Sequence, residues 1–369
     1  MHVPVLAEEQ HAMPVICPTD ATATGALSGS TRPLLGTLQR RPTAVSGPAS
    51  VFRSSSRHSR KATMTTTPDP TLNQPSRASS SVDGSRPFGA HLSMRWWVPL
   101  VLTIIVVAAI YGLQLLFGAL AAIVEFGLLG KDPDDSPLTP LPYLATNLAI
   151  ILVAPLTLLL LAKMGRVPWR SALSLGRAFS RRRLATYLGL FAALMVLANA
   201  AVQLINPSPL SLFAVSGTTI TLLAVVVVTT PLQAAAEEIA FRGVLTASYA
   251  SWVRASGPAL IVGITGSSVL FSLVHTSTDP WMILNYLGLG ASTAVMALIS
   301  RGLEAPIAFH VMNNVFAMGI GALFAEGDGI AQDRSAGAGG PYMLVFLVAE
   351  LVAVAVVWLL EKRRRRNLR

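Results

Sequence analysis

Long apolar runs separated by short polar segments occupy the chain from residue 95 onward. Most of these runs are close to the ~20 residues that a helix needs to cross the hydrocarbon core of a bilayer. They predict eight membrane-spanning helices, at about residues 97–128, 141–163, 185–205, 217–236, 258–276, 281–300, 305–324 and 341–360. The fourth is expected to continue as a helix to about residue 250. The expected fold class is all-α, a polytopic membrane bundle.

The first 94 residues contain no comparable run and are rich in Ser, Thr, Pro, Ala and Arg. Such a composition offers too little apolar surface to offset the entropy that is lost when a chain becomes ordered. The pattern therefore divides the chain into a disordered N-terminal segment, residues 1–94, and a membrane domain, residues 95–369.

The overall composition also indicates a membrane protein. The chain is 52% hydrophobic and only 12% charged, with a mean hydropathy of +0.57, whereas a soluble domain has roughly 25% charged residues. A net charge of +10 would suggest nucleic acid in a soluble protein, but the basic residues here flank the apolar runs. We therefore expect membrane lipids, and no nucleic acid, as partners. The single cysteine, Cys17, excludes an intramolecular disulfide and a cysteine-based metal cluster.

The loops alternate in charge. Most Lys and Arg residues lie before the first predicted helix, in every second loop after it, and in the C-terminal tail. The other loops are neutral or mainly acidic. By the positive-inside rule, this alternation requires an even number of spans and places both termini in the cytoplasm. We expect a plasma membrane protein; an organelle membrane is the alternative, because the Arg- and Ser-rich N-terminus partly fits a transit peptide.

Two adjacent carboxylates, Glu237 and Glu238, interrupt the apolar character of the fourth helix. Two neighbouring carboxylates in an apolar helix cannot both ionise without compensation. Arg242 lies four residues after Glu238, so the two side chains share one helical face and can pair. Glu237 points about 100° away and is left free as a base or ligand. The alternative is a helix-packing ion pair, with Glu237 reaching the cytoplasmic edge.

Two histidines follow on later helices. His275 ends the fifth apolar run, one turn after Phe271, and His310 lies one turn before Asn314 in the seventh. A histidine and an amide on one face can jointly bind a metal or a carbonyl oxygen. Each feature also has a structural alternative: an interface histidine, or an interhelical hydrogen bond. Together they supply a carboxylate, two imidazoles and an amide, the groups that assist hydrolysis.

The motifs Glu-Glu-x-x-x-Arg at 237–242, Phe-x-x-x-His at 271–275 and His-x-x-x-Asn at 310–314 resemble, in sequence and order, those of the CAAX-protease/bacteriocin-processing (CPBP) family. The resemblance covers about residues 215–325. It implies a CAAX-prenyl-protease-like intramembrane endopeptidase acting on a peptide or membrane-protein substrate. Some family members are bacteriocin-immunity or regulatory proteins, so a non-enzymatic scaffold is one alternative function. A proton-coupled transporter is another.

The resemblance also implies roles for these residues. Glu237 is expected to activate water, Glu238 and Arg242 to hold the site, and Asn314 to steady the oxyanion. Two mechanisms stay open. In the first, His275, His310 and Glu238 bind a divalent metal, expected to be zinc, that lowers the pKa of water. In the second, Glu237 and His275 activate water directly, while His310 and Asn314 stabilise the oxyanion.

The predicted spans place the two histidines at different depths. His275 falls near the non-cytoplasmic end of its predicted helix, whereas His310 lies near the cytoplasmic end of its own helix. At 1.5 Å per residue these levels differ by tens of Å. A shared site therefore requires helices that are short, tilted or broken.

Overall fold

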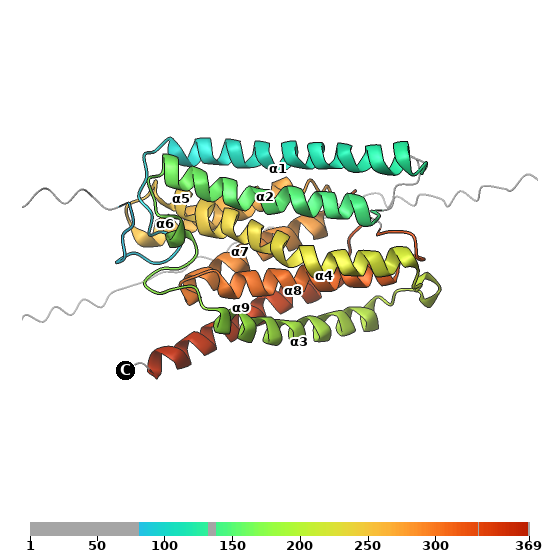
Figure 1. Ribbon diagram of the computed structural model, residues 1–369. Helices are drawn as coiled ribbons and strands as arrows, with labels where there is room; N and C mark the ends of the chain where they lie inside the picture. The colour runs from blue at the N-terminus through green and yellow to red at the C-terminus, as the bar shows by residue number, and fades with distance from the viewer. Residues whose placement is uncertain (1–80, 132–137, 331, 368–369) are drawn as a thin grey trace, which may run out of the picture. The chain divides into compact units, whose positions relative to one another are not determined.

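The computed structural model describes residues 81–131, 138–330 and 332–367 (Figure 1). The helices are α1 (Val98–Ala122, continued by a π-helical segment, Ile123–Leu128), α2 (Pro140–Met164), α3 (Arg181–Ile205), α4 (Gly217–Glu238), α5 (Thr246–Ala250), α6 (Ser256–Val274), α7 (Pro280–Ser300), α8 (Glu304–Leu323) and α9 (Leu344–Arg366). Extended pairing within these residues is limited to isolated bridges. The expected all-α fold is thereby confirmed.

Eight helical stretches in the described ranges are long and apolar enough to cross a membrane, with α4 and α5 belonging to one stretch, Gly217–Ala250. Their positions agree with the eight predicted segments. Many large apolar side chains on them face outward, among them Leu204, which is 88% exposed, and Leu115, which is 76% exposed. Apolar surface of this extent is stable against lipid rather than water. The chain is therefore a multi-pass membrane protein.

The long helix α4 lies between α2 and α8 (Figure 1). α1 packs on α2, and α3 packs on α8. α6, α7 and α9 form a second group, in which α7 contacts both of its neighbours and also α8. Between the groups lies the main apolar core, to which the buried aromatic rings of Phe191, Phe241, Phe271 and Phe309 belong.

Unequal helix lengths bring the first of the two histidines to the depth of the glutamates. The stretch that contains α4 and α5 has 34 residues, whereas α6 has only 19. The hydroxyl of Ser267 on α6 lies 2.7 Å from that of Thr246 on α5. His275 follows Ser267 by eight residues, and Glu238 precedes Thr246 by eight, so both lie ~12 Å from this contact in the same direction.

The second histidine reaches the same level from α8. Leu303, just before α8, packs beside Gly243, so that a Cβ atom at Gly243 would lie 3.2 Å from its side chain. His310 follows Leu303 by seven residues and Glu237 precedes Gly243 by six, about 10 Å in either case. The separation in depth expected from the apolar runs is therefore wrong. It assumed that all helices start at one level, whereas α6 begins beyond the level at which α8 starts.

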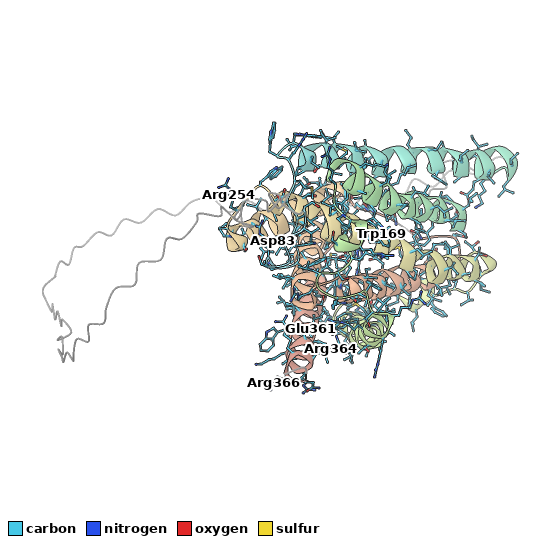
Figure 2. All side chains as sticks on the ribbon, turned by 60° about the vertical axis from the view of Figure 1, so that its left-hand side comes forward. Asp83, Trp169, Arg254, Glu361, Arg364 and Arg366 are labelled. Carbon is cyan, nitrogen blue, oxygen red and sulfur yellow. The ribbon has the colours of Figure 1, made fainter. Side chains whose placement is uncertain are left out.

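One end of the bundle collects the basic loops. We call it the basic end; it comprises the loops 165–180, 251–255 and 301–303 and the last residues of α9. Figure 2 labels Arg254, Glu361, Arg364 and Arg366 there. Two ion pairs join its elements: Arg177 with Glu304 at the start of α8, and Arg183 with Glu361 on α9. In the sequence these arginines indicate topology, and in the structure both also hold helices together.

Residues 81–94, which were assigned to the disordered segment, pack against the basic end. The side chains of Phe88, His91 and Leu92 are at most 1% exposed. The Nε2 atom of His91 lies 2.9 Å from the carbonyl oxygen of Ser171, and burial lowers the pKa of His91 to about 4. The boundary predicted at residue 94 is therefore too late, because scattered apolar residues contribute to a core without forming a run. Residues 1–80 lie outside the described residues, and their disorder stays a prediction.

Close packing at Gly243 gives the fold a direct test. A Cβ atom there would lie 2.6 Å from the carbonyl oxygen of Ala172, whereas one at Gly189 on α3 would meet nothing within 4 Å. Gly243→Ala should destabilise the protein by about 1–3 kcal/mol through overpacking. Gly189→Ala, the matched control, should be neutral or slightly stabilising, because Ala favours a helix. The measurement is the melting temperature of both full-length variants in detergent. Equal shifts from the wild-type value would contradict this packing.

Candidate active site

The two glutamates close α4 and face different surroundings. A π-helical segment, Ile239–Leu245, begins directly after Glu238. Segments of this kind change the phase of the side chains and are frequent at functional sites. The Glu238 side chain is fully buried, whereas the Glu237 side chain keeps 12% exposure. The asymmetry predicted from the spacing to Arg242 is therefore present.

Glu238 lies between a cation and an imidazole. Its Oε2 atom is 3.4 Å from Nε of Arg242, the predicted partner four residues later. Its Oε1 atom accepts a hydrogen bond of 2.8 Å from Nδ1 of His310 on α8. The charge of this carboxylate is thus compensated within the protein, as burial in an apolar medium requires.

Arg242 extends this cluster to two more helices. Its Nε atom donates a 2.8 Å hydrogen bond to the hydroxyl of Thr293 on α7. Its guanidinium group lies 4.1 Å from the ring centroid of Phe271 on α6, a cation–π contact. The Phe271 ring in turn contacts His275, at 4.5 Å between centroids, and His310, at 5.8 Å. Each of the three sequence motifs therefore supplies a residue that contacts this buried phenyl ring.

Glu237 faces a cavity of ~450 Å³ and is the one carboxylate among the described residues that line it. His275, Asn313 and Asn314 line the same cavity, as do Gln233, Tyr286 and Arg334. Its walls include the starts of α2, α7 and α9, which lie at the end of the bundle away from the basic end. The cavity thus extends from Glu237 toward that opposite end.

His310 is buried behind Glu237 and does not itself line the cavity. Its Nε2 atom lies 3.4 Å from Oε2 of Glu237, while Nδ1 is bonded to Glu238. Glu238 and Arg242 balance one another in charge. With Nδ1 of His310 protonated, one further proton makes the whole cluster neutral. That proton can reside either on the carboxyl group of Glu237 or on Nε2 of His310. Such a pair can exchange a proton without a net charge in the apolar core.

His275 caps the C-terminal end of α6. Its Nδ1 atom lies 2.6 Å from the carbonyl oxygen of Phe271, which can only accept, so this nitrogen carries the proton. The Nε2 atom is then a free acceptor. The ring stacks on Tyr286 of α7 with centroids 4.2 Å apart, which fixes its orientation.

Asn314 lies on the cavity wall, one turn after His310. Its amide nitrogen donates to the side-chain oxygen of Gln233 at 3.3 Å, and Asn313 donates to the Asn314 oxygen at 3.1 Å. Gln233, Tyr286 and Thr293 were not among the residues predicted from the sequence. Gln233 precedes Glu237 by four residues, a same-face spacing that could have revealed it. Tyr286 and Thr293 carry no local signal, because only the packing of α7 brings them to the site.

A loop after α8 covers the far side of His275. Arg334 donates a 2.6 Å hydrogen bond to the carbonyl oxygen of His275, and its own carbonyl accepts from the backbone of Thr278. Asp279 begins α7 and accepts hydrogen bonds from the backbone N–H groups of Met282 and Gly337. These bonds hold the pKa of the Asp279 carboxyl group below its usual value. The loop is thus fixed to the turn that bears His275.

The suggested metal ligands do not form a ligand set. Within the described ranges, no three His, Cys, Asp or Glu side chains form a group that could hold a metal ion. Glu238 is engaged by His310 and Arg242, and both ring nitrogens of His310 face carboxylates. The donors of His310 and Glu238 are therefore engaged within the cluster, which leaves Nε2 of His275 as the one free nitrogen of the suggested set.

Comparison with known proteins agrees with the motifs. The family model described as "Type II CAAX prenyl endopeptidase Rce1-like" matches residues 217–316, which contain α4 to the middle of α8 and every residue of the three motifs. No curated protein and no solved structure matches the chain. The match covers less than a third of the chain, and together with the eight-span bundle it supports the resemblance to the CPBP family of intramembrane endopeptidases.

Proposed function

We propose that this membrane endopeptidase hydrolyses a peptide bond with a water molecule that Glu237 activates. The observation that carries the proposal is that the two adjacent glutamates differ in burial and in their contacts. Glu238 is fully buried and compensated by Arg242 and His310, whereas Glu237 opens onto the cavity that His275 and Asn314 also line. A general base must combine access to water with a position near the reacting groups, and Glu237 has both.

In the first step, the Glu237 carboxylate and Nε2 of His275 orient a water molecule between them. Glu237 takes a proton from the water as its oxygen attacks the carbonyl carbon of the peptide. The carbonyl oxygen becomes an oxyanion. When the C–N bond breaks, the same proton passes to the amine nitrogen, which leaves as a neutral amine. The products are a carboxylic acid and an amine, with no net change of charge in the site.

Asn314 and His310 suit the stabilisation of the oxyanion. The Asn314 amide is a neutral donor on the cavity wall, and preorganised donors of this kind contribute strongly where water is excluded. His310 lies behind Glu237, and its Nε2 proton places positive charge beside the reacting atoms. In this mechanism the side chains of the protein carry every step, since within the described residues no group of His, Cys, Asp and Glu side chains presents a common set of metal donors.

The substrate in this proposal is a peptide or membrane-protein chain presented at the bilayer. Exposed apolar side chains surround the bundle, and the cavity lies within the membrane-spanning helices. We place both termini in the cytoplasm of a cell with this protein in its plasma membrane, because the arginine-rich loops share the basic end. The cavity would then be reached from within the bilayer or from the non-cytoplasmic side.

Replacing Glu237 separates an enzyme from a scaffold. Glu237→Gln keeps the shape of the side chain but removes the base, so cleavage should fall about 10²–10⁴-fold, with normal accumulation in the membrane. Glu326→Gln, an exposed substitution outside the cavity, is the control and should leave the rate unchanged. The measurement is the initial rate of cleavage of a fluorogenic peptide. Unchanged cleavage in the Glu237 variant would exclude Glu237 as the base, and retained cellular function in that variant would favour the scaffold hypothesis.

A metal assay separates the two mechanisms. We expect an active, purified preparation to contain much less than one equivalent of zinc, and its activity to survive a chelator. The measurement is the zinc content of the wild-type protein and of His310→Ala by elemental analysis, together with the cleavage activity of both. Stoichiometric zinc that is lost together with activity in His310→Ala would instead establish the metal mechanism.

A further inference from the structure

A second cavity, of ~780 Å³, lies at the basic end, and its lining shares no residue with the cavity that Glu237 faces. Its walls come from three separate parts of the chain: residues 84–88, the end of α7, and the last turns of α9. The cationic side chains in its lining are Arg86, Arg301, Lys362, Arg365 and Arg366. Figure 2 shows the C-terminal part of this region, with Glu361, Arg364 and Arg366 labelled.

These five cations lack acidic partners. Within the described residues, none of them forms an ion pair with Asp or Glu. Glu361 is the one acidic residue of the lining, and it is already bonded to Arg183, Arg364 and the hydroxyl of Tyr187. Asp83 interacts electrostatically with Arg86 without forming an ion pair. The cavity therefore concentrates positive charge that is not ion-paired within the described residues.

Backbone contacts hold some of these cations in place and leave donors free. Arg86 donates to the carbonyl oxygen of Val253 at 3.0 Å, and Arg365 to that of Ile299 at 3.0 Å. The Nε atom of Arg86 is buried and has no hydrogen-bond partner. A guanidinium group that is held by one bond and keeps further donors is well suited to a phosphate group.

The position of the cavity matches the surface of a bilayer. Trp358 and the apolar residues Leu298 and Ile299 form part of its wall. Trp358 is 49% exposed, and the Lys362 ammonium group lies 4.6 Å from its ring centroid. Tryptophan next to Lys and Arg at the end of an apolar helix is typical of the level of lipid headgroups. Basic pockets between helices at this level bind anionic headgroups.

We propose that this cavity binds the phosphate headgroup of an anionic phospholipid, with the acyl chains lying along α7 and α9. The bound phosphate would be shared by residues 84–88, α7 and α9, which it would join across the basic end. The site is separate from the catalytic cavity, and the proposal does not depend on the endopeptidase activity.

The test compares two double variants that each remove two positive charges from the basic end. Lys362→Gln with Arg365→Gln changes the cavity lining, whereas Arg181→Gln with Arg182→Gln removes exposed arginines outside it. Full-length protein is purified in neutral detergent and titrated with phosphatidylglycerol, with phosphatidylcholine, and with inorganic phosphate alone. Retained lipid is measured by native mass spectrometry, and stabilisation by the melting temperature.

The wild type and the Arg181/Arg182 variant should retain phosphatidylglycerol in preference to phosphatidylcholine. The Lys362/Arg365 variant should bind phosphatidylglycerol about thirty-fold more weakly, the factor that two lost contacts between basic side chains and an anionic surface produce. Arg86→Gln, in the part of the wall formed by residues 84–88, should weaken binding in the same way if the double variant fails to fold. Equal lipid binding by all variants, or stabilisation by inorganic phosphate that phosphatidylglycerol does not exceed, would overturn the proposal.

Discussion

The compensation of one buried carboxylate, Glu238, organises the membrane domain. A charge in a bilayer-embedded core is costly unless partners surround it. Here Arg242 and His310 supply those partners, and Arg242 continues to Thr293 and to the ring of Phe271. The cluster therefore joins α4 to α6, α7 and α8. Removing any member would leave another buried polar group without a partner, so the fold and the site share the same constraint.

This cluster also explains why adjacent glutamates differ. Glu238 is buried and paired with Arg242, and these contacts fix the rotation of the helix so that Glu237 points into the cavity. His310 connects the two, with one ring nitrogen facing each carboxylate. The base is thus held next to a group that can carry its counter-charge. In the proposed mechanism, Glu238 thereby positions both Glu237, the proposed base, and His310, the proposed source of positive charge.

The sequence predicted the helices well because eight apolar runs of adequate length have few alternatives in a membrane. It also predicted the Glu238–Arg242 contact, which depends only on helical spacing. The depth of His275 could not be predicted from apolar runs, since it depends on how far α6 is shifted along α5. Tyr286 and Thr293 depend on the packing of α7 in the same way. Residues 81–94 were missed because Phe88 and Leu92 are isolated apolar residues, and their burial depends on tertiary contacts.

The protonation of His310 tests the central claim most directly. If Glu238 accepts a hydrogen bond from this ring, Nδ1 must carry a proton whichever group holds the second one. Nitrogen-15 NMR of histidine-labelled protein measures this, with the His310 signals identified by their loss in His310→Gln. The account predicts a protonated Nδ1 whose signal shifts strongly in Glu238→Gln. An unprotonated Nδ1 with the proton on Nε2, unaffected by Glu238→Gln, would contradict it.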